Sequence, residues 1–339
     1  MFREVHAARL RAVSVAPPVA PPVAPLVASL IASATALFAL AQPAVAASAN
    51  PSAACTGKAP AGELTAQRIA AVTPSRSEAG LYEGPVWIKD ALYFSDFSFA
   101  AGFPSRIRKL AADGSVSTVI EDSGSNGLAV DAKGGLVAAS HKDKALMRYP
   151  LDGAARTPIA RQYAGQVFNS PNDIAIAADG TLYFTDPDYQ KSAAPGGQPL
   201  TAVYRVGTDG KVTLVDGSRP NPNGIALSPQ GDVLYVTAND GLLKAYPIAH
   251  GMPGPGRELV RGLDGPDGMT VDCHGNLYAT EHGAKRVRVF SPQGRELATI
   301  RVDANVTNAA FGGVDGKTLY ITGAGALWQL KLNVGGAPY

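Results

Sequence analysis

The sequence predicts an all-β protein, a six-bladed β-propeller closed by an N-terminal strand that completes the last blade. The main observation is a repeat: alternating apolar residues, a turn that usually contains glycine, then a leucine that opens a second apolar run. The six leucines are Leu92, Leu136, Leu182, Leu234, Leu277 and Leu319, at spacings of 44, 46, 52, 43 and 42 residues. Repeats of this length with several strands each are typical of propeller blades.

A second, weaker hairpin follows the first in most repeats, for example at 105–120, 202–215 and 285–300. Each repeat therefore supplies four strands, which is one blade. The last repeat ends after 326–332 with only three strands, and the segment 63–72 is available to supply the fourth. Closing the ring in this way removes unpaired sheet edges. We expect one propeller domain over residues 63–335.

Residues 1–46 have the pattern of a signal peptide. Three arginines precede an apolar run at 26–41, and Ala44-Val45-Ala46 gives a small-x-small cleavage pattern. We expect cleavage near Ala47, a flexible segment at 47–62, and a periplasmic or secreted protein. A membrane anchor is the competing interpretation, but the apolar run is shorter than the ~20 residues that span a bilayer. The prediction is a mature protein without a membrane association.

Charge and cysteine content limit the partners of the mature chain. Residues 1–46 carry three arginines and one glutamate, so the remaining chain has 27 basic and 27 acidic residues. A chain of balanced charge gives no indication of nucleic-acid binding. Cys55 and Cys273 are the two cysteines, and they could form a disulfide in an exported protein or remain as two thiols.

One position recurs at the start of the first strand of all six repeats. It lies 9 to 11 residues before the leucine of its repeat, and it is occupied by Glu83, Asn126, Asn172, Asn223, Asp267 and Asn308. We call these six residues the oxygen ring, because every one is a carboxylate or an amide. The first strands of a propeller line its central channel, so the six side chains should meet at one end of the axis.

Oxygen ligands without histidine or cysteine are the donor set of a hard cation such as calcium. The alternative is that Asn and Asp simply satisfy backbone groups where loops enter strands. The second strands return to the same end and finish near His141, Asp186 and His282. We expect these three residues, with Asn126 and Asn172, to bind the substrate. The long insertion 186–200 suits a lid, or is a plain loop.

Four motifs in register resemble those of one family. "YEGP" (82–85), "NSPND" (169–173) followed by "YFTDPDY" (183–189), "PNGIALSP" (222–229) and "GPDGMTVD" (265–272) are similar to motifs of the senescence marker protein / gluconolactonase / luciferin-regenerating enzyme family, especially its bacterial gluconolactonase branch. The resemblance spans about residues 78–332. It implies a six-bladed propeller that hydrolyses small-molecule lactones of sugar acids or related compounds with one divalent cation. That cation is usually calcium, and zinc, manganese or magnesium are the alternatives.

The resemblance also implies roles for single residues. Glu83, Asn172, Asn223 and Asp267 fall on the metal ligands of the family, and Asp267 on its proposed general base. A ligand carboxylate is normally a poor base because the cation lowers its pKa, so Asp173 and Asp186 remain candidates for proton transfer. Some members carry an arginine where this chain has Ser170. Arg106 or Lys191 could replace it, but both are more simply read as surface charges.

Three other functions compete with the lactonase. His141 and His282 suggest a metal-dependent esterase or organophosphatase of the paraoxonase type. A non-catalytic, ligand-binding propeller with a structural calcium would also keep the oxygen ring. A strictosidine-synthase-like propeller fits less well, because Glu83 and Asp267 together indicate a metal. The sequence has no G-x-S-x-G motif, which disfavours a serine hydrolase.

Overall fold

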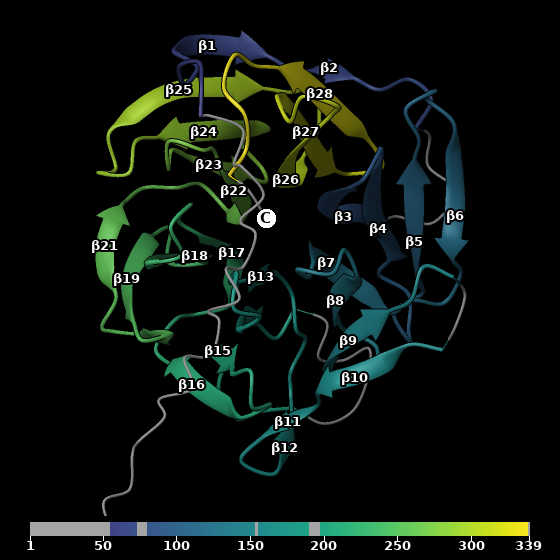
Figure 1. Cartoon of the computed structure of the whole chain (residues 1–339), viewed down its shortest axis with the longest axis vertical. Coiled ribbons are helices and arrows are strands. Elements are labelled where there is room, and N and C mark those ends of the chain that lie inside the picture. Colours follow the sequence, from purple (N-terminus) through teal and green to yellow (C-terminus); the bar gives the residue numbers. More distant parts are fainter. Residues whose placement is uncertain (1–54, 73–79, 153–154, 190–196, 338–339) are drawn as a thin grey trace, which may run out of the picture. The chain divides into compact units, whose positions relative to one another are not determined.

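The computed structural model describes residues 55–72, 80–152, 155–189 and 197–337, which contain strands and turns but no helix. Six sheets stand around a common axis (Figure 1). The innermost strands are β3 (Gly80–Ile88), β7 (Ser125–Val130), β13 (Ile174–Ile176), β17 (Pro222–Leu227), β22 (Pro266–Val271) and β26 (Val306–Gly312). The all-β, six-bladed propeller predicted from the repeats is confirmed.

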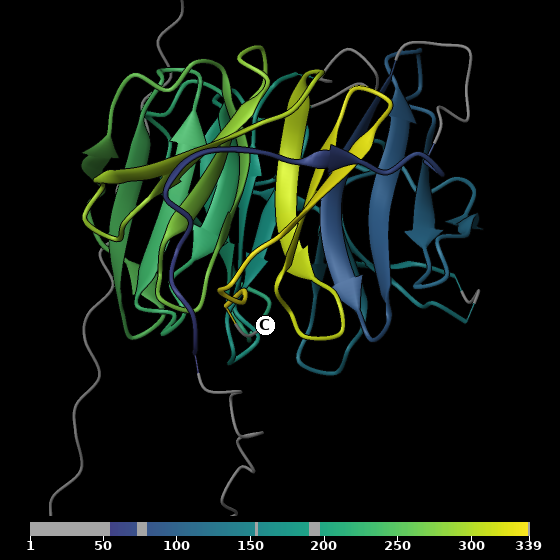
Figure 2. The ribbon, with the colours of Figure 1, turned by 90° about the horizontal axis from the view of Figure 1, so that it is seen from above.

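Each inner strand pairs antiparallel with a second strand that opens at the repeated leucine or one residue before it. These strands are β4 (Ala91–Ser98), β8 (Leu136–Ser140), β14 (Leu182–Asp186), β18 (Val233–Ala238), β23 (Leu277–Glu281) and β27 (Thr318–Gly323). The third strands are β5 (Ser105–Leu110), β9 (Ala145–Tyr149), β15 (Ala202–Val206), β19 (Leu243–Ala249), β24 (Arg286–Phe290) and β28 (Leu327–Lys331). Figure 2 shows the strands running between the two ends of the axis.

The outer strands are β6 (Val116–Ile120), β10 (Thr157–Ala160), β16 (Val212–Asp216), β21 (Arg257–Val260) and β25 (Glu296–Arg301). Two short pieces lie beside this pattern. The hairpin of β11 (Gln162–Tyr163) and β12 (Gln166–Val167) joins the second and third blades, and β20 (Met252–Pro253) pairs with β19. We number the blades in chain order, from the first (β3–β6) to the sixth (β26–β28).

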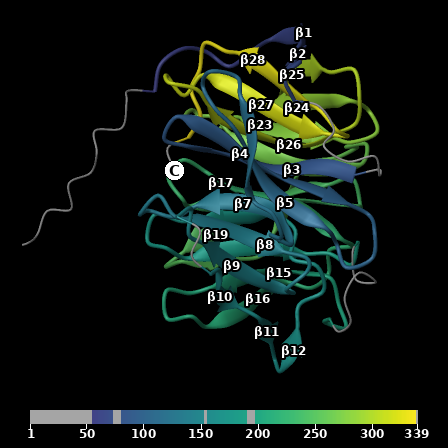
Figure 3. The ribbon, with the colours of Figure 1, turned by 90° about the vertical axis from the view of Figure 1, so that its right-hand side faces the viewer.

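The sixth blade is completed by a strand from the N-terminal side, as predicted, but the strand is shorter than expected. The segment 63–72 divides at Ala66: β1 (Gly62–Thr65) pairs parallel with β25 in the fifth blade, and β2 (Gln67–Arg68) pairs antiparallel with β28. Ala66 is buried, and its amide donates to the carbonyl oxygen of Arg301. The segment thus joins two neighbouring blades (Figure 3).

The hydrophobic core lies mainly between neighbouring blades, because strands in the middle of a blade are covered on both faces. Phe168, Phe184 and Tyr204 form one aromatic group between the second and third blades, with ring centroids 4.9–5.4 Å apart. Tyr278 and Phe311 meet edge to face between the fifth and sixth blades. Such packing fixes the angle between blades and therefore the place of each inner strand.

Both ends of the described chain are attached to the turn between β22 and β23. Cys55 forms a disulfide with Cys273, and Nε2 of His274 lies 2.9 Å from the carbonyl oxygen of Gly57. Gly336 makes a β-bridge to Asp272. The described part of the segment 47–62 is therefore tethered to the propeller, where the sequence had suggested a flexible stretch. The expected signal peptide, residues 1–46, lies outside the described residues.

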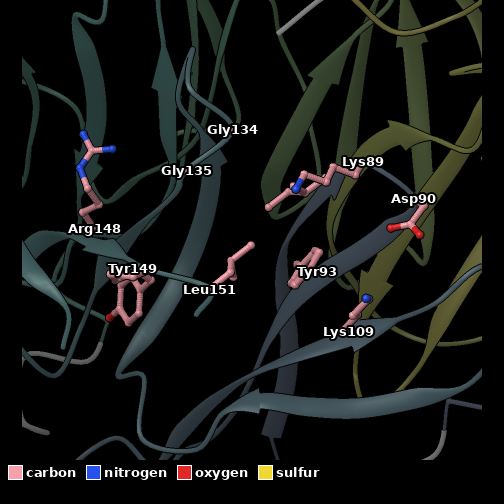
Figure 4. Close-up of a pocket in the computed structure, with 11 residues that line it drawn as sticks. Lys89, Asp90, Tyr93, Lys109, Gly134, Gly135, Arg148, Tyr149 and Leu151 are labelled. Atoms are coloured by element: carbon pink, nitrogen blue, oxygen red, sulfur yellow. The ribbon is translucent and has the colours of Figure 1, made fainter. Parts of the chain in front are cut away.

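One cavity of about 490 Å³ lies at the opposite end of the blades from the oxygen ring. It is lined by the turns after β3 and β7, with Lys89 in the first of them, and by Tyr93 on β4, Lys109 on β5 and Arg148 on β9 (Figure 4). The cavity lies where the inner strands end, whereas the oxygen ring lies where they begin. The cavity is therefore not part of the site described below. In the described residues, no helix is long and apolar enough to cross a membrane.

The disulfide should stabilise the closed ring. It links residues 218 positions apart, and closing a loop of that size removes much of the entropy of the unfolded chain. We expect Cys55→Ser to lower the free energy of unfolding by about 2–5 kcal/mol, measured by denaturant unfolding without reductant. Reductant should lower the stability of the wild type to that of the variant. Equal stability of oxidised wild type and variant would contradict this role.

Candidate active site

The inner strands approach each other very closely at the end where they begin, which we call the site end. A Cβ atom added to Gly84 would collide with the backbone of Asn126, one added to Gly127 with Asn172, and one added to Gly224 with Asp267. Glycine follows the ring residue in these blades because only glycine leaves room for the neighbouring backbone. The close approach brings residues of the oxygen ring from successive blades side by side.

Hydroxyl groups on the second strands connect the ring positions of adjacent blades. Oγ of Ser95 donates to the carbonyl oxygen of Asn126 (2.6 Å), and Oγ1 of Thr185 donates to that of Asn223 (2.6 Å). Oγ1 of Thr237 donates to the carbonyl oxygen of Asp267 (2.8 Å). Each bond contributes about 1 kcal/mol. They hold the backbone of the ring in register while its side chains remain available.

Three carboxylates from different blades gather on the axis: Glu83, Asp173 and Asp267. All three are at least nine-tenths buried. They lie near enough to one another for the charge of one carboxylate to raise the pKa of another. The side chain of Asn308 lies near both Glu83 and Asp173, where its amide favours the charged carboxylates and lowers the pKa of each. These residues belong to the first, third, fifth and sixth blades, so the inner strands bring three members of the oxygen ring together with Asp173.

Burial raises the pKa of all three carboxyl groups. For Glu83 the cause is first desolvation and then the charges of Asp267 and Asp173, so its pKa lies well above the usual range. Desolvation raises the pKa of Asp173 to about 7. The hydrogen bonds that its carboxylate accepts from the amides of Ile174 and Ile225 lower the pKa but only partly offset this effect. Desolvation also raises the pKa of Asp267. Three carboxylates without a counter-charge are therefore costly at neutral pH.

Two asparagine side-chain oxygens of the ring are without a hydrogen-bond donor in the part of the chain that the structure describes. Oδ1 of Asn126 and Oδ1 of Asn223 are buried, and no group in the described residues donates a hydrogen bond to either. A buried acceptor without a donor costs about 1–3 kcal/mol. Orphaned amide oxygens beside buried carboxylates are the donor set that a hard divalent cation satisfies. The residues of the site fit such a cation.

His282 is in contact with Asp267. Its Nδ1 lies 3.5 Å from Oδ2 of Asp267 and 2.7 Å from the carbonyl oxygen of Val306, and its Nε2 is 3.2 Å from Nδ2 of Asn305. The hydrogen bond with Asp267 raises the pKa of His282. The side chain is about one-third exposed. His282 therefore connects the buried carboxylate to the surface of the site end.

His141 occupies different surroundings. It is buried, its ring packs on Phe103 with centroids 4.6 Å apart, and neither ring nitrogen has a partner among the described residues. Burial, with a smaller effect of Lys144, lowers the pKa of His141 to about 3. The ring is neutral near pH 7, and none of its contacts reaches the three carboxylates. The structure does not bring His141 together with His282.

Asp186, which the sequence suggested for substrate binding, has both carboxylate oxygens engaged by backbone amides. Its Oδ2 accepts from the backbone amide of Asn169 (2.8 Å) and its Oδ1 from that of Ser170 (2.7 Å). The fully buried carboxylate thus shapes the loop that leads into Asn172. Asn172 itself is held by its backbone, which accepts from the amide of Gly127 and donates to the carbonyl oxygen of Thr185.

Sequence reasoning missed part of the site. Asp173 was considered only for proton transfer and Asn308 only as a ring position, although Asp173 is one of the three buried carboxylates and Asn308 affects the pKa of two of them. Tyr189 was not considered, yet its hydroxyl lies at the site end, 2.7 Å from Oδ1 of Asn239. A signal was present, because Tyr189 ends the quoted motif "YFTDPDY". Residues 190–196 of the predicted lid, including Lys191, lie outside the described residues.

Fold and site together define a class: a six-bladed propeller with a buried group of carboxylates and amides at one end of its axis. The sequence model of a protein family, the SMP-30/Gluconolactonase/LRE-like region, matches residues 81–325. The chain belongs to this family. The match includes all six ring positions, so the family resemblance and the geometry describe the same residues.

Known proteins of the family resemble the chain over most of its length. It is 32% identical over 277 residues to the gluconolactonase of Zymomonas mobilis, which covers 71% of this chain and 75% of that protein. A gluconolactonase structure from Xanthomonas campestris has 29% identity and a TM-score of 0.69, covering 82% and 98%. The calcium-binding regucalcin of Agrobacterium tumefaciens has 21% identity and a TM-score of 0.67, covering 82% and 97%, and shows likeness of fold.

The raised pKa values predict an unusual pH dependence for chelator-treated protein. Between about pH 4, where an unfolded aspartate titrates, and pH 7, the folded protein binds more protons than the unfolded chain. The free energy of unfolding should therefore fall as pH rises. Asp173→Asn cannot titrate and should reduce this decline by up to about 1.4 kcal/mol per pH unit, measured by denaturant unfolding. Parallel pH profiles of variant and wild type would contradict the burial argument.

Proposed function

We propose that this protein is a metal-dependent lactonase that opens lactones of sugar acids or related compounds. The observation that carries the proposal is the group of buried carboxylates and orphaned amide oxygens on the axis. Gluconolactonases among the relatives of the chain support lactone hydrolysis as the reaction.

The residues proposed to hold one divalent cation are Glu83, Asn172, Asn223 and Asp267. Calcium fits best because all donors are oxygens, and zinc, manganese or magnesium are the alternatives. The calcium-binding relative supports the first choice. When bound, the cation would supply a Lewis acid for the lactone carbonyl oxygen and for the negative charge that develops on it.

Asp267 is the proposed proton acceptor. The carboxylate of Asp186 is occupied by two backbone amides, and that of Asp173 accepts from the amides of Ile174 and Ile225. Asp267 instead contacts His282, which is partly exposed and can pass a proton outward. This contact distinguishes Asp267 from the other two aspartates.

Lactone hydrolysis consumes one water molecule and opens the ring. The water oxygen adds to the carbonyl carbon while Asp267 takes one of its protons. The bond between that carbon and the ring oxygen breaks, and the ring oxygen leaves as an alkoxide. The proton returns to this alkoxide, so the product is a hydroxy acid and Asp267 is regenerated.

The groups proposed to bind the substrate are Asn126, Asn172, His141 and His282. Oδ1 of Asn126 and both ring nitrogens of His141 are buried and without partners among the described residues. The amide oxygen can accept a hydrogen bond from a sugar hydroxyl, and the neutral imidazole offers one nitrogen that accepts and one that donates. Oγ of Ser170 also lacks a partner there, at the position where some family members carry arginine. Asp186 is proposed to position this loop.

The alternative functions make different demands on the site. An esterase that uses two histidines at the metal needs His141 near the carboxylates, and its contacts are instead with aromatic rings. A non-catalytic propeller with a structural calcium would retain the oxygen ring but would show no turnover. Export to the periplasm or secretion is also proposed, and the Cys55–Cys273 disulfide supports an oxidising compartment.

Hydrolysis of gluconolactone and a panel of other lactones tests the proposed function. Chelator should abolish turnover by the purified protein, and calcium, manganese or zinc should restore it to different degrees. The panel would rank the substrates. Cation binding without turnover of any lactone would contradict the lactonase and favour a ligand-binding propeller.

The substitution Asp267→Asn tests whether Asp267 is the proton acceptor. At saturating cation, kcat should fall by a factor of about 100 to 10,000, the usual contribution of a general base. Asp209→Asn is the matched control because Asp209 lies in the exposed turn between β15 and β16, where its Oδ1 accepts from the amide of Lys211. The control should keep full activity. Full activity of Asp267→Asn would rule out the proposed role.

A further inference from the structure

The cavity at the end opposite to the oxygen ring lies between the first and second blades. Its volume of about 490 Å³ is in the range of sites for small molecules, roughly 300–1,000 Å³. Figure 4 shows its two walls, with Lys89 and Tyr93 on the first blade and Arg148 and Leu151 on the second. The residues that line it include none of the oxygen ring, so a ligand bound here would not occupy the candidate active site.

A glycine in the turn between β7 and β8 explains why there is space. In the fifth blade, the equivalent turn carries Asn276, whose Nδ2 lies 3.0 and 2.8 Å from the two carboxylate oxygens of Asp272. The second blade has Asp131 and Gly135 at these two places. Arg148 of β9 forms an ion pair with Asp131 instead. Because Gly135 lines the cavity, the missing side chain leaves its second-blade wall open.

Apolar side chains make up one part of the lining. They come from both blades and are Ile88, Tyr93, Pro150 and Leu151. Leu151 is 43% exposed, and the buried Tyr93 turns one edge of its ring to the cavity. An apolar or aromatic body that entered between the two walls would cover this surface and would be stabilised by its removal from water.

The other part of the lining is mainly cationic. It contains Lys89, Lys109 and Arg148, against the single carboxylate of Asp90. The charge of Arg148 is balanced by Asp131, whereas neither lysine forms an ion pair with any residue that the structure describes. Nζ of Lys109 lies 5.9 Å from the centre of the Tyr93 ring, so one cation stands beside the apolar surface.

The backbone fixes the position of Lys89 in a tight turn. Lys89 adopts a positive φ of 57°, which glycine or asparagine adopts at lower cost than lysine. The indole Nε1 of Trp87 donates to the carbonyl oxygen of Lys89 (3.0 Å), and its ring is stacked on Tyr320. The turn is therefore held from the sixth blade, and it places a cation at the cavity.

We propose that this cavity binds a small organic anion with an apolar or aromatic body, such as an aromatic carboxylate or sulfonate. The two lysines attract the anionic head, and the apolar side chains cover the body. A sugar acid fits less well, because its hydroxyl groups would lie against the apolar part of the lining. The proposal is independent of the lactonase, since the cavity and the oxygen ring lie at opposite ends of the blades.

The test is calorimetric titration of the purified protein with three probes that separate head and body. Naphthalene-2-sulfonate has both, and it should bind at one saturable site with an affinity that falls as salt is added. Naphthalene-2-methanol has the body without the charge, and it should bind about 5- to 30-fold more weakly, the effect of losing two partly exposed charge pairs. Inorganic sulfate has only the charge, and it should bind more weakly still.

Variants locate the site on the protein. Lys89→Glu and Lys109→Glu should each weaken binding of naphthalene-2-sulfonate about 5- to 30-fold, because an attraction is replaced by a repulsion. Lys211→Glu is the matched control, since it changes the net charge equally and Lys211 lies in the exposed turn between β15 and β16, away from the cavity. Its affinity should equal that of the wild type. All three variants should melt at the temperature of the wild type, because none of these lysines is buried.

Three results would overturn the inference. The first is the absence of saturable binding of naphthalene-2-sulfonate, and the second is binding that neither Lys89→Glu nor Lys109→Glu weakens. The third is competitive inhibition of lactone hydrolysis by the probe, which would place it at the oxygen ring. A wild type that hydrolyses no lactone but binds the probe in a manner sensitive to both lysines would contradict the proposed function and support this inference.

Discussion

The close approach of six inner strands at one end of the axis is the constraint on which the site depends. Glycine at positions 84, 127, 224 and 268 lets neighbouring backbones and side chains come nearer than any Cβ would allow. Hydroxyl groups on the second strands then join neighbouring blades across four of the six gaps. The consequence is electrostatic: carboxylates far apart in sequence, Glu83, Asp173 and Asp267, share one buried region. The same close packing that closes the ring therefore also brings the carboxylates together on its axis.

The cost of this arrangement explains the character of the site. Desolvation raises the pKa of each carboxyl group, and their mutual repulsion adds to it for Glu83. Only part of the cost is offset by the Asn308 amide and by hydrogen bonds from backbone amides. In the proposed function, a divalent cation would offset the remainder and make this group of charges a binding site. Tethering of both chain ends to one turn holds the ring closed around it.

The fold and the oxygen ring could be predicted from sequence because both depend on periodic features. The leucine spacing gives the blades, and the position 9 to 11 residues before each leucine gives the ring. Contacts that break the period could not be predicted. Asp173 replaces the glycine found at the same place in four other blades, and Tyr189 enters from an irregular segment. Asp186 has the expected place at the end of its strand, but its carboxylate accepts hydrogen bonds from the backbone of a neighbouring loop, which the repeat does not predict. The division of the N-terminal strand at Ala66 likewise depends on tertiary contacts.

The central claim is that the buried carboxylates form one binding site for a divalent cation. The most direct measurement is a calcium titration by calorimetry at pH 6, repeated in buffers of different ionisation enthalpy. We expect one calcium per chain, release of protons on binding because the carboxyl groups are partly protonated beforehand, and loss of binding in Glu83→Gln. Absence of binding, or binding that releases no protons and is unaffected by Glu83→Gln, would contradict it.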